Sequence, residues 1–161
     1  MQFYEKYITS LEKNEVFQFG SNKSGFSGAG SAGFATFNKA GNVWRAEKYD
    51  EWPHGKKGCW NVKGISEGFM KGTCGRSYAI PTVTKPGAKK SISIADIKLS
   101  IMSFYAFALA EQQLKFFVAQ DATPGLNGHS ADDMAEAYAC MPIPNNIYFY
   151  KPFWELVKSK L

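Results

Sequence analysis

Two glycine-rich stretches, each placed shortly after an apolar run, constrain this chain more than any other feature. The apolar residues 16–19 lead directly into residues 20–30, and the apolar residues 116–119 precede residues 123–130. A buried strand that runs into a glycine-rich turn and then a helix presents backbone N–H groups and a helix N-terminus to an anion. Two such stretches predict a site for a diphosphate.

Length and composition predict one domain over residues 1–161. The chain is 45% hydrophobic and 16% aromatic, which suffices for one full core, and no break in composition divides it. No apolar run reaches the roughly 18 residues that a membrane span needs, and residues 1–6 lack the pattern of a signal peptide. We therefore expect a cytoplasmic protein with no membrane partner.

The cysteines favour neither a disulfide framework nor a zinc site. Cys59, Cys74 and Cys140 are odd in number, and none belongs to a C-x-x-C pair. We expect reduced thiols, no metal site and no cofactor.

Positive charge is concentrated in one segment of the chain. Residues 55–90 hold eight Lys or Arg residues against one acidic residue, whereas residues 116–150 hold four acidic residues and no Lys or Arg. Such a segment can attract a nucleotide, a nucleic acid or another polyanion. It equally fits a solvated loop whose lysines keep the protein soluble.

Hydrophobic periodicity predicts alternating helices and strands, and hence an α/β sandwich. Ser93 and Ser130 are expected to cap helices, the first with an apolar face of Ile97, Ile101, Tyr105, Ala108 and Leu109. Residues 42–75 have no regular period and are expected to be largely irregular, with short strands at best. We expect further helices over 3–11, 32–40 and from 152 onward, and strands at 16–19, 77–82 (ended by Pro81), 115–120 and 146–150.

Four motifs follow one another along residues 16–154. They are F-G-S-N-x-x-G-x-x-G-A-G at 19–30, G-x-S-Y-A-I-P-T at 75–82, G-L-x-G-H at 125–129, and N-I-Y-F ahead of Trp154. In this order the motifs resemble the macro-domain-like proteins of bacteria and their phages. The resemblance implies a three-layer α/β/α sandwich with a mixed sheet, whose two glycine loops hold the diphosphate of an ADP-ribose-like nucleotide. It implies the host cytoplasm if a phage encodes the protein.

The resemblance also implies the site residues, position by position. Asn22 is expected to contact a hydroxyl or phosphate group of the ligand, although it also fits a residue that supports a turn. Where relatives tend to carry Gly-Cys-Gly, this chain has Pro124, which lacks an N–H donor and predicts a weaker grip on phosphate. The first ligand loop would comprise Gly20, Ser21, Asn22, Gly25, Ser27, Gly28, Ala29 and Gly30, and the phosphate loop Gly125, Leu126, Asn127, Gly128 and His129.

Candidate catalytic residues are few. Hydrolysis needs an activated water and hence a base, and residues 20–33 contain no Asp, Glu or His. Asp121, at the end of a predicted strand, is the first candidate, although it also fits a turn carboxylate. His129 is the second, and it can contact a ribose or a phosphate or be an exposed loop residue. No nucleophile lies at a defined spacing from His54.

Three functions remain open from the sequence. The first is a module that binds ADP-ribose or a related nucleotide. The second is a hydrolase that cleaves the ADP-ribosyl bond or a terminal phosphate of such a compound. The third is a basic nucleic-acid-binding or interaction domain, in which aromatic residues lie near lysines; these aromatic residues are Trp44, Trp52, Trp60 and Phe69.

Overall fold

The structure is a computed structural model that describes residues 2–25, 30–37, 66–71 and 75–161. Within these residues, one mixed sheet has the strand order β1-β6-β5-β2-β4-β3. All neighbouring strands pair in parallel except β3, which runs antiparallel to β4. The strands are β1 (Phe3–Tyr4), β2 (Glu15–Asn22), β3 (Gly68–Lys71), β4 (Arg76–Val83), β5 (Lys115–Val118) and β6 (Ile147–Tyr150).

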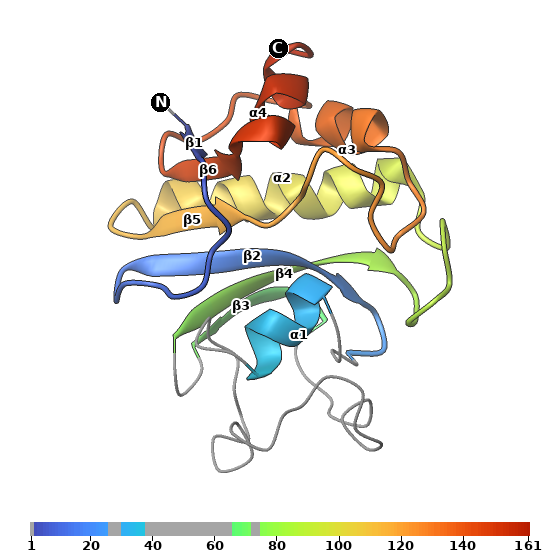
Figure 1. Cartoon of the computed structure of the whole chain (residues 1–161), viewed down its shortest axis with the longest axis horizontal. Coiled ribbons are helices and arrows are strands. Elements are labelled where there is room, and N and C mark those ends of the chain that lie inside the picture. The colour runs from blue at the N-terminus through green and yellow to red at the C-terminus, as the bar shows by residue number, and fades with distance from the viewer. Residues whose placement is uncertain (1, 26–29, 38–65, 72–74) are drawn as a thin grey trace.

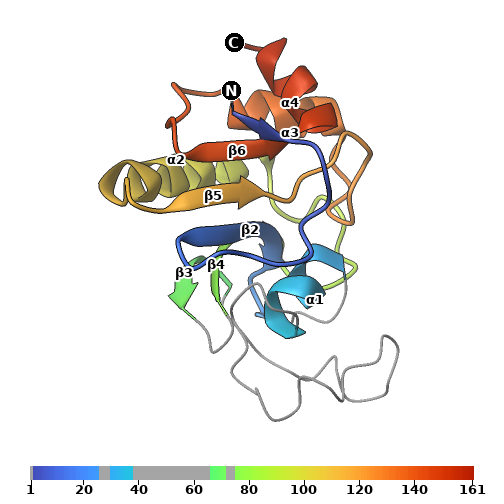
Figure 2. The ribbon, with the colours of Figure 1, turned by 60° about the vertical axis from the view of Figure 1, so that its left-hand side comes forward.

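Helices cover both faces of this sheet. One face is covered by α1, and the other by α2, α3 and α4, as Figures 1 and 2 show from two sides. The predicted α/β class and mixed sheet are therefore confirmed. The helices are α1 (Gly30–Phe37), α2 (Ile94–Ala110), α3 (Ala131–Tyr138) and α4 (Lys151–Lys158). None of the helices in the described residues is long and apolar enough to cross a membrane.

Strand β2 lies in the middle of the sheet and contributes to a hydrophobic cluster on each face. Val16 belongs to the larger cluster beneath α2, α3 and α4, whereas Phe17 and Phe19 belong to the smaller cluster beneath α1. Alternate residues of a strand point to opposite faces, so a strand covered on both sides is apolar at nearly every position. Gln18 is the polar exception within this run.

The helix caps are confirmed. The Ser93 hydroxyl accepts a hydrogen bond from the backbone N–H of Asp96, and the Ser130 hydroxyl accepts one from that of Asp133. Four of the five residues predicted for the apolar face of α2 are buried, but Leu109 is 56% exposed. Phe104 is buried on this face instead, in contact with Phe116.

The predicted helix over residues 3–11 is wrong. Phe3 and Tyr4 form an edge strand parallel to β6, and the Tyr4 hydroxyl donates to the carbonyl oxygen of Val118 at 2.8 Å. Aromatic residues favour strands, and the edge of β6 offers unpaired backbone groups. This long-range pairing outweighs the helical spacing of the apolar residues.

Pro81 does not end the second predicted strand, because β4 continues to Val83. The register between β2 and β4 shifts next to this proline, between Ser21 and Asn22. Proline cannot donate to a ladder and is tolerated in strands at such irregularities. The short strand β3 lies in the segment predicted to be largely irregular.

Asn146 joins three parts of the core at the other end of the sheet. Its buried Nδ2 lies 2.9, 3.2 and 3.1 Å from the carbonyl oxygens of Ala108, Glu111 and Leu114. These carbonyls belong to the end of α2 and the turn before β5. One side-chain amide therefore satisfies backbone groups that have lost access to water.

We predict that Asn146→Ala lowers the free energy of unfolding by about 2 kcal/mol, because buried carbonyl groups lose their donor. Urea denaturation measures the change. The control is Asn145→Ala, since Asn145 is exposed and most surface substitutions change stability by no more than about 0.5 kcal/mol. Equal stability of the two variants would contradict this role of Asn146.

Candidate functional site

The candidate site lies at the carboxyl end of the central strand β2, whose two neighbours β4 and β5 lie on opposite sides of it. From β2 the chain reaches β4 on one side, whereas β5 pairs with the other side of β2 and is followed by β6. Ligands of open α/β sheets bind at such a switch point, outside the carboxyl ends of the strands. A cavity of about 270 Å³ occupies this position.

Both glycine-rich stretches contribute to the wall of this cavity, which we call the loop cavity. The start of α1 and the loop from β5 to α3 lie at the same end of the sheet (Figure 2). The lining residues are Gln18, Gly20, Gly30, Ser31, Ala32, Thr82, Ala119, Gln120, Asp121, Thr123, Gly125, Leu126, Asn127, Met134 and Tyr138.

Gly20 keeps the floor of the loop cavity open. It follows Val16 and Gln18 by the two-residue period of the strand, so a side chain there would point to the same face. A Cβ atom on Gly20 would lie 3.3 Å from Oγ1 and 3.7 Å from Cγ2 of Thr82. A side chain at residue 20 would therefore press against Thr82, with which it shares the wall of the cavity.

The two glycine-rich stretches approach each other at Gly30 and Leu126, which both line the cavity. Gly30 has φ +60°, and a Cβ atom there would lie 3.8 Å from Cδ1 of Leu126. Leu126 is otherwise 77% exposed. The side chain of Leu126 therefore lies beside Gly30 and is otherwise open to solvent.

Backbone donors, and not basic side chains, are available to an anion in the loop cavity. The N–H groups of Gly125, Leu126 and Asn127 donate to no other described residue. The first N–H groups of α1 also lack partners within that helix. No Lys or Arg is among the described lining residues. The wall therefore offers neutral N–H donors and the positive end of a helix dipole.

Several residues of the predicted first loop lie away from this wall. The Asn22 side-chain oxygen accepts from the Ser24 hydroxyl at 2.6 Å, and the Asn22 carbonyl accepts from the N–H of Gly25 at 3.0 Å. These bonds match the interpretation of Asn22 as a turn residue. Ser21 donates from its hydroxyl to the carbonyl of Ser66. None of these residues lines the loop cavity.

His129 packs into the structure, so the prediction of an exposed loop residue is wrong. The residue is 7% exposed, and its Nε2 lies 2.8 Å from the carbonyl oxygen of Ile92. A carbonyl can only accept, so Nε2 carries the proton. The backbone N–H of His129 donates to the side-chain oxygen of Asn127 at 2.9 Å. The ring is engaged in holding the loop, and it does not line the cavity.

Gly128 joins the second glycine-rich stretch to the lysine-rich loop. Its φ is +83°, and a Cβ atom there would lie only 2.8 Å from Cβ of Lys89. The N–H of Lys90 donates to the carbonyl of Asn127 at 2.7 Å. A side chain at residue 128 would therefore disturb the loop itself.

Asp121 lines the loop cavity and also has protein partners. Its carboxylate accepts from the Tyr7 hydroxyl at 3.0 Å and from the N–H of Ala122 at 2.6 Å. The position of Asp121 is thus compatible with both interpretations, a candidate catalytic base and a turn carboxylate. The hydrogen bond to Asp121, followed by one to Tyr150, raises the pKa of Tyr7 to about 12.

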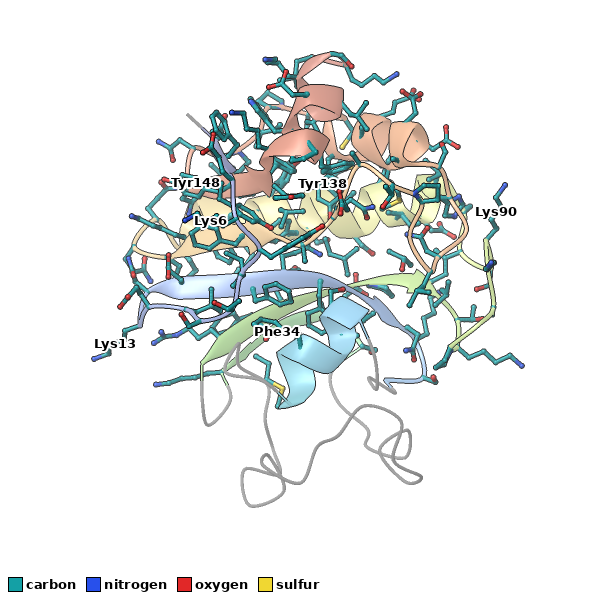
Figure 3. The ribbon with its side chains drawn as sticks, in the orientation of Figure 1. Lys6, Lys13, Phe34, Lys90, Tyr138 and Tyr148 are labelled. Carbon is teal, nitrogen blue, oxygen red and sulfur yellow. The ribbon has the colours of Figure 1, made fainter. Side chains whose placement is uncertain are left out.

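A second cavity of about 310 Å³ adjoins the first. The two share Gly30, Ser31 and Ala119 in their walls. We call the second the ring cavity, because aromatic side chains dominate its lining: Tyr4, Tyr7, Phe17, Phe34 and Tyr150. Phe34 points from α1 toward the sheet (Figure 3) and meets Phe17 edge to face, with ring centroids 4.8 Å apart.

Sequence reasoning missed Gln18, Thr82 and Tyr138 as lining residues. One signal was present, because a glutamine in the middle of an apolar strand is costly to bury without a partner. The hydrogen-bond partner of Gln18 is the Tyr138 hydroxyl, at 2.8 Å. The aromatic residues of the ring cavity come from distant segments, and no local pattern joins them.

Other predicted features lie wholly or partly outside the described residues. Phe69 is described, and its ring stacks on Phe107 with centroids 5.1 Å apart, so it belongs to the core. Lys71, Lys85, Lys89 and Lys90 are exposed, and Cys140 is an exposed free thiol. Outside the described residues lie Ser27, Gly28, Ala29, Trp44, Trp52, His54, Lys56, Lys57, Cys59, Trp60, Lys63 and Cys74.

Neither metal-site geometry nor similarity to known proteins assigns a function. Among the residues that the structure describes, no three His, Cys, Asp or Glu side chains form a group that could hold a metal ion. No protein-family model matches the chain, and no curated protein matches it. Functional inference therefore depends on the two adjoining cavities.

We predict that Asp121→Asn lowers the pKa of Tyr7 toward its ordinary value of 10. The negative carboxylate favours the protonated phenol, and a neutral amide does so less. Titration of the tyrosine ring carbons by NMR measures the shift. The control is Asp133→Asn, which removes an exposed carboxylate on α3 that does not act on Tyr7, so this titration should stay unchanged. An unshifted Tyr7 in Asp121→Asn would contradict the contact.

Proposed function

We propose that this chain is a macro-like module that binds ADP-ribose or a closely related nucleotide. The observation that carries the proposal is the loop cavity, into which both glycine-rich stretches open at the switch point of the sheet. The diphosphate would accept hydrogen bonds from the N–H groups of Gly125, Leu126 and Asn127. The order of the four sequence motifs supports the same family of ligands.

The ring cavity supports a nucleotide in preference to a simple diphosphate. Flat aromatic walls suit a nucleobase, whose π-face stacks on Tyr or Phe rings. Tyr7 and Tyr150 already stack on each other with centroids 4.9 Å apart. Since the two cavities share Gly30, Ser31 and Ala119, one ligand can place its base in the ring cavity and its diphosphate in the loop cavity.

Steric closure of the loop cavity tests this function. We predict that Gly20→Val lowers the affinity for ADP-ribose roughly tenfold or more, which corresponds to about 1.4 kcal/mol. The added side chain would press against Thr82 and reduce the room in the cavity that both residues line. Isothermal titration calorimetry measures the affinity, and a melting curve shows whether the variant is folded.

The control variant is Ala106→Val, which adds the same kind of bulk at an exposed position of α2. It should bind ADP-ribose as the wild type does. If the wild-type protein binds neither ADP-ribose nor ADP at millimolar concentration, the proposed function is wrong.

Hydrolysis of such a nucleotide is the second candidate function, because Asp121 lines the same cavity. A carboxylate there could take a proton from an attacking water. His129 is less suited, since its ring already contacts Ile92.

If the wild type cleaves ADP-ribosylated protein or ADP-ribose 1″-phosphate, Asp121→Asn should reduce kcat more than it changes KM. This pattern identifies an interaction made in the transition state. Product formation followed by chromatography is the measurement. Equal kcat in both proteins would remove Asp121 from the reaction, and no product from the wild type would leave binding as the function.

A further inference from the structure

Gln18 is a buried polar side chain in which the amide oxygen has a described hydrogen-bond partner but the amide nitrogen does not. The residue is 2% exposed and lies in β2, between the apolar Phe17 and Phe19. Its Oε1 accepts a hydrogen bond from the Tyr138 hydroxyl at 2.8 Å. Burial of an amide without hydrogen bonds costs free energy, so the fate of its Nε2 protons matters.

Tyr138 fixes the direction in which the Gln18 amide points. Burial raises the pKa of the Tyr138 phenol well above its ordinary value, so the hydroxyl keeps its proton. Its single proton goes to Oε1 of Gln18. The end of α3 is held as well, because the Tyr105 hydroxyl donates to the Tyr138 carbonyl at 2.5 Å. With Oε1 held by Tyr138, Nε2 is directed elsewhere.

The remaining direction is the loop cavity. Gln18 lines that cavity, and Nε2 donates to no other described residue. Among the described side chains, the one fully enclosed polar atom without a partner is Oδ1 of Asn146. Nε2 is therefore not sealed in the core, and its protons face the cavity.

The charge of the loop cavity favours an uncharged ligand group beside Gln18. Thr82 and Tyr138 contribute neutral hydroxyls, Asp121 contributes a negative carboxylate, and no described lining residue is basic. The diphosphate would already occupy the backbone N–H groups of Gly125, Leu126 and Asn127, so a terminal phosphate monoester would share the cavity with the Asp121 carboxylate and have neither a cation nor a further backbone donor to balance its charge. A sugar hydroxyl pays no such penalty and can both accept and donate.

We propose that Gln18 is a ligand-contacting, specificity-determining residue, which donates from Nε2 to a hydroxyl oxygen of an uncharged sugar at the end of the nucleotide. Tyr138 is its positioning residue. This inference rests on the proposed function. It adds that the site prefers a nucleotide ending in a free sugar to the same compound ending in a phosphate.

Calorimetry with three ligands tests the assignment. ADP-ribose carries the terminal sugar, ADP lacks it, and ADP-ribose 1″-phosphate carries a charged end. The wild type should bind ADP-ribose more tightly than either of the others. Gln18→Met preserves the length of the side chain but removes the donor, and it should weaken ADP-ribose binding roughly 3- to 10-fold while ADP binding stays unchanged.

Two further variants separate positioning from packing. Tyr138→Phe removes the hydroxyl that orients Gln18 and should reduce the preference for ADP-ribose over ADP in the same direction, by a smaller factor. Gln113→Met makes the same substitution as Gln18→Met at an exposed turn and should leave all three affinities unchanged. Melting curves show which variants are folded, and if Gln18→Met is unfolded, Tyr138→Phe decides.

The outcomes distinguish this inference from the proposed function. If Gln18→Met weakens ADP and ADP-ribose equally, Gln18 has a structural role and the inference is wrong, while the function stands. Unchanged ADP-ribose binding in Gln18→Met, or tighter wild-type binding of the phosphorylated ligand, also overturns it. If the wild type binds none of the three ligands, the proposed function fails and the inference fails with it.

Discussion

The parallel pairing of β2 on both of its edges is the constraint on which the rest of the structure depends. Strand β2 pairs with β4 over seven residue pairs and with β5 over four. Because both partners are parallel to it, the chain must leave the carboxyl ends of β2 and β5 at the same edge of the sheet. The two glycine-rich stretches follow these strands, so their meeting is a consequence of strand order. Gly20, two residues before the end of β2, adds no side chain to the cavity where the stretches meet.

The cavity wall and the surface beside it differ in charge. Within the loop cavity, the described wall offers backbone N–H groups, neutral side chains and the carboxylate of Asp121, but no basic side chain. Beside it, Gly128 packs against Lys89, and Lys90 bonds to Asn127 and extends from the end of the molecule (Figure 3). Exposed lysines can raise the local concentration of an anionic ligand at low salt. Selection among anions then falls to the geometry of the neutral donors.

The sequence was sufficient for features that depend on neighbours along the chain. The capping serines, the strand at residues 16–19 and the positions of both glycine-rich stretches follow from local pattern. The N-terminal segment could not be predicted in this way, because its strand exists through pairing with β6. The same limit applies to His129, whose environment is set by Ile92, 37 residues away. Gln18 was visible as an oddity, but its partner Tyr138 lies 120 residues away.

The N-terminal segment links the stability of the sheet to the formation of the site. By pairing with β6 it covers a sheet edge that would otherwise expose unpaired backbone groups. The same pairing brings Tyr4 to the carbonyl of Val118 and Tyr7 to the carboxylate of Asp121. Two lining residues of the ring cavity, Tyr4 and Tyr7, thus come from the edge strand β1 and the segment that follows it. A change that frees this edge strand would therefore open the ring cavity and remove a partner of Asp121 at once, so edge pairing and ligand site form one physical unit.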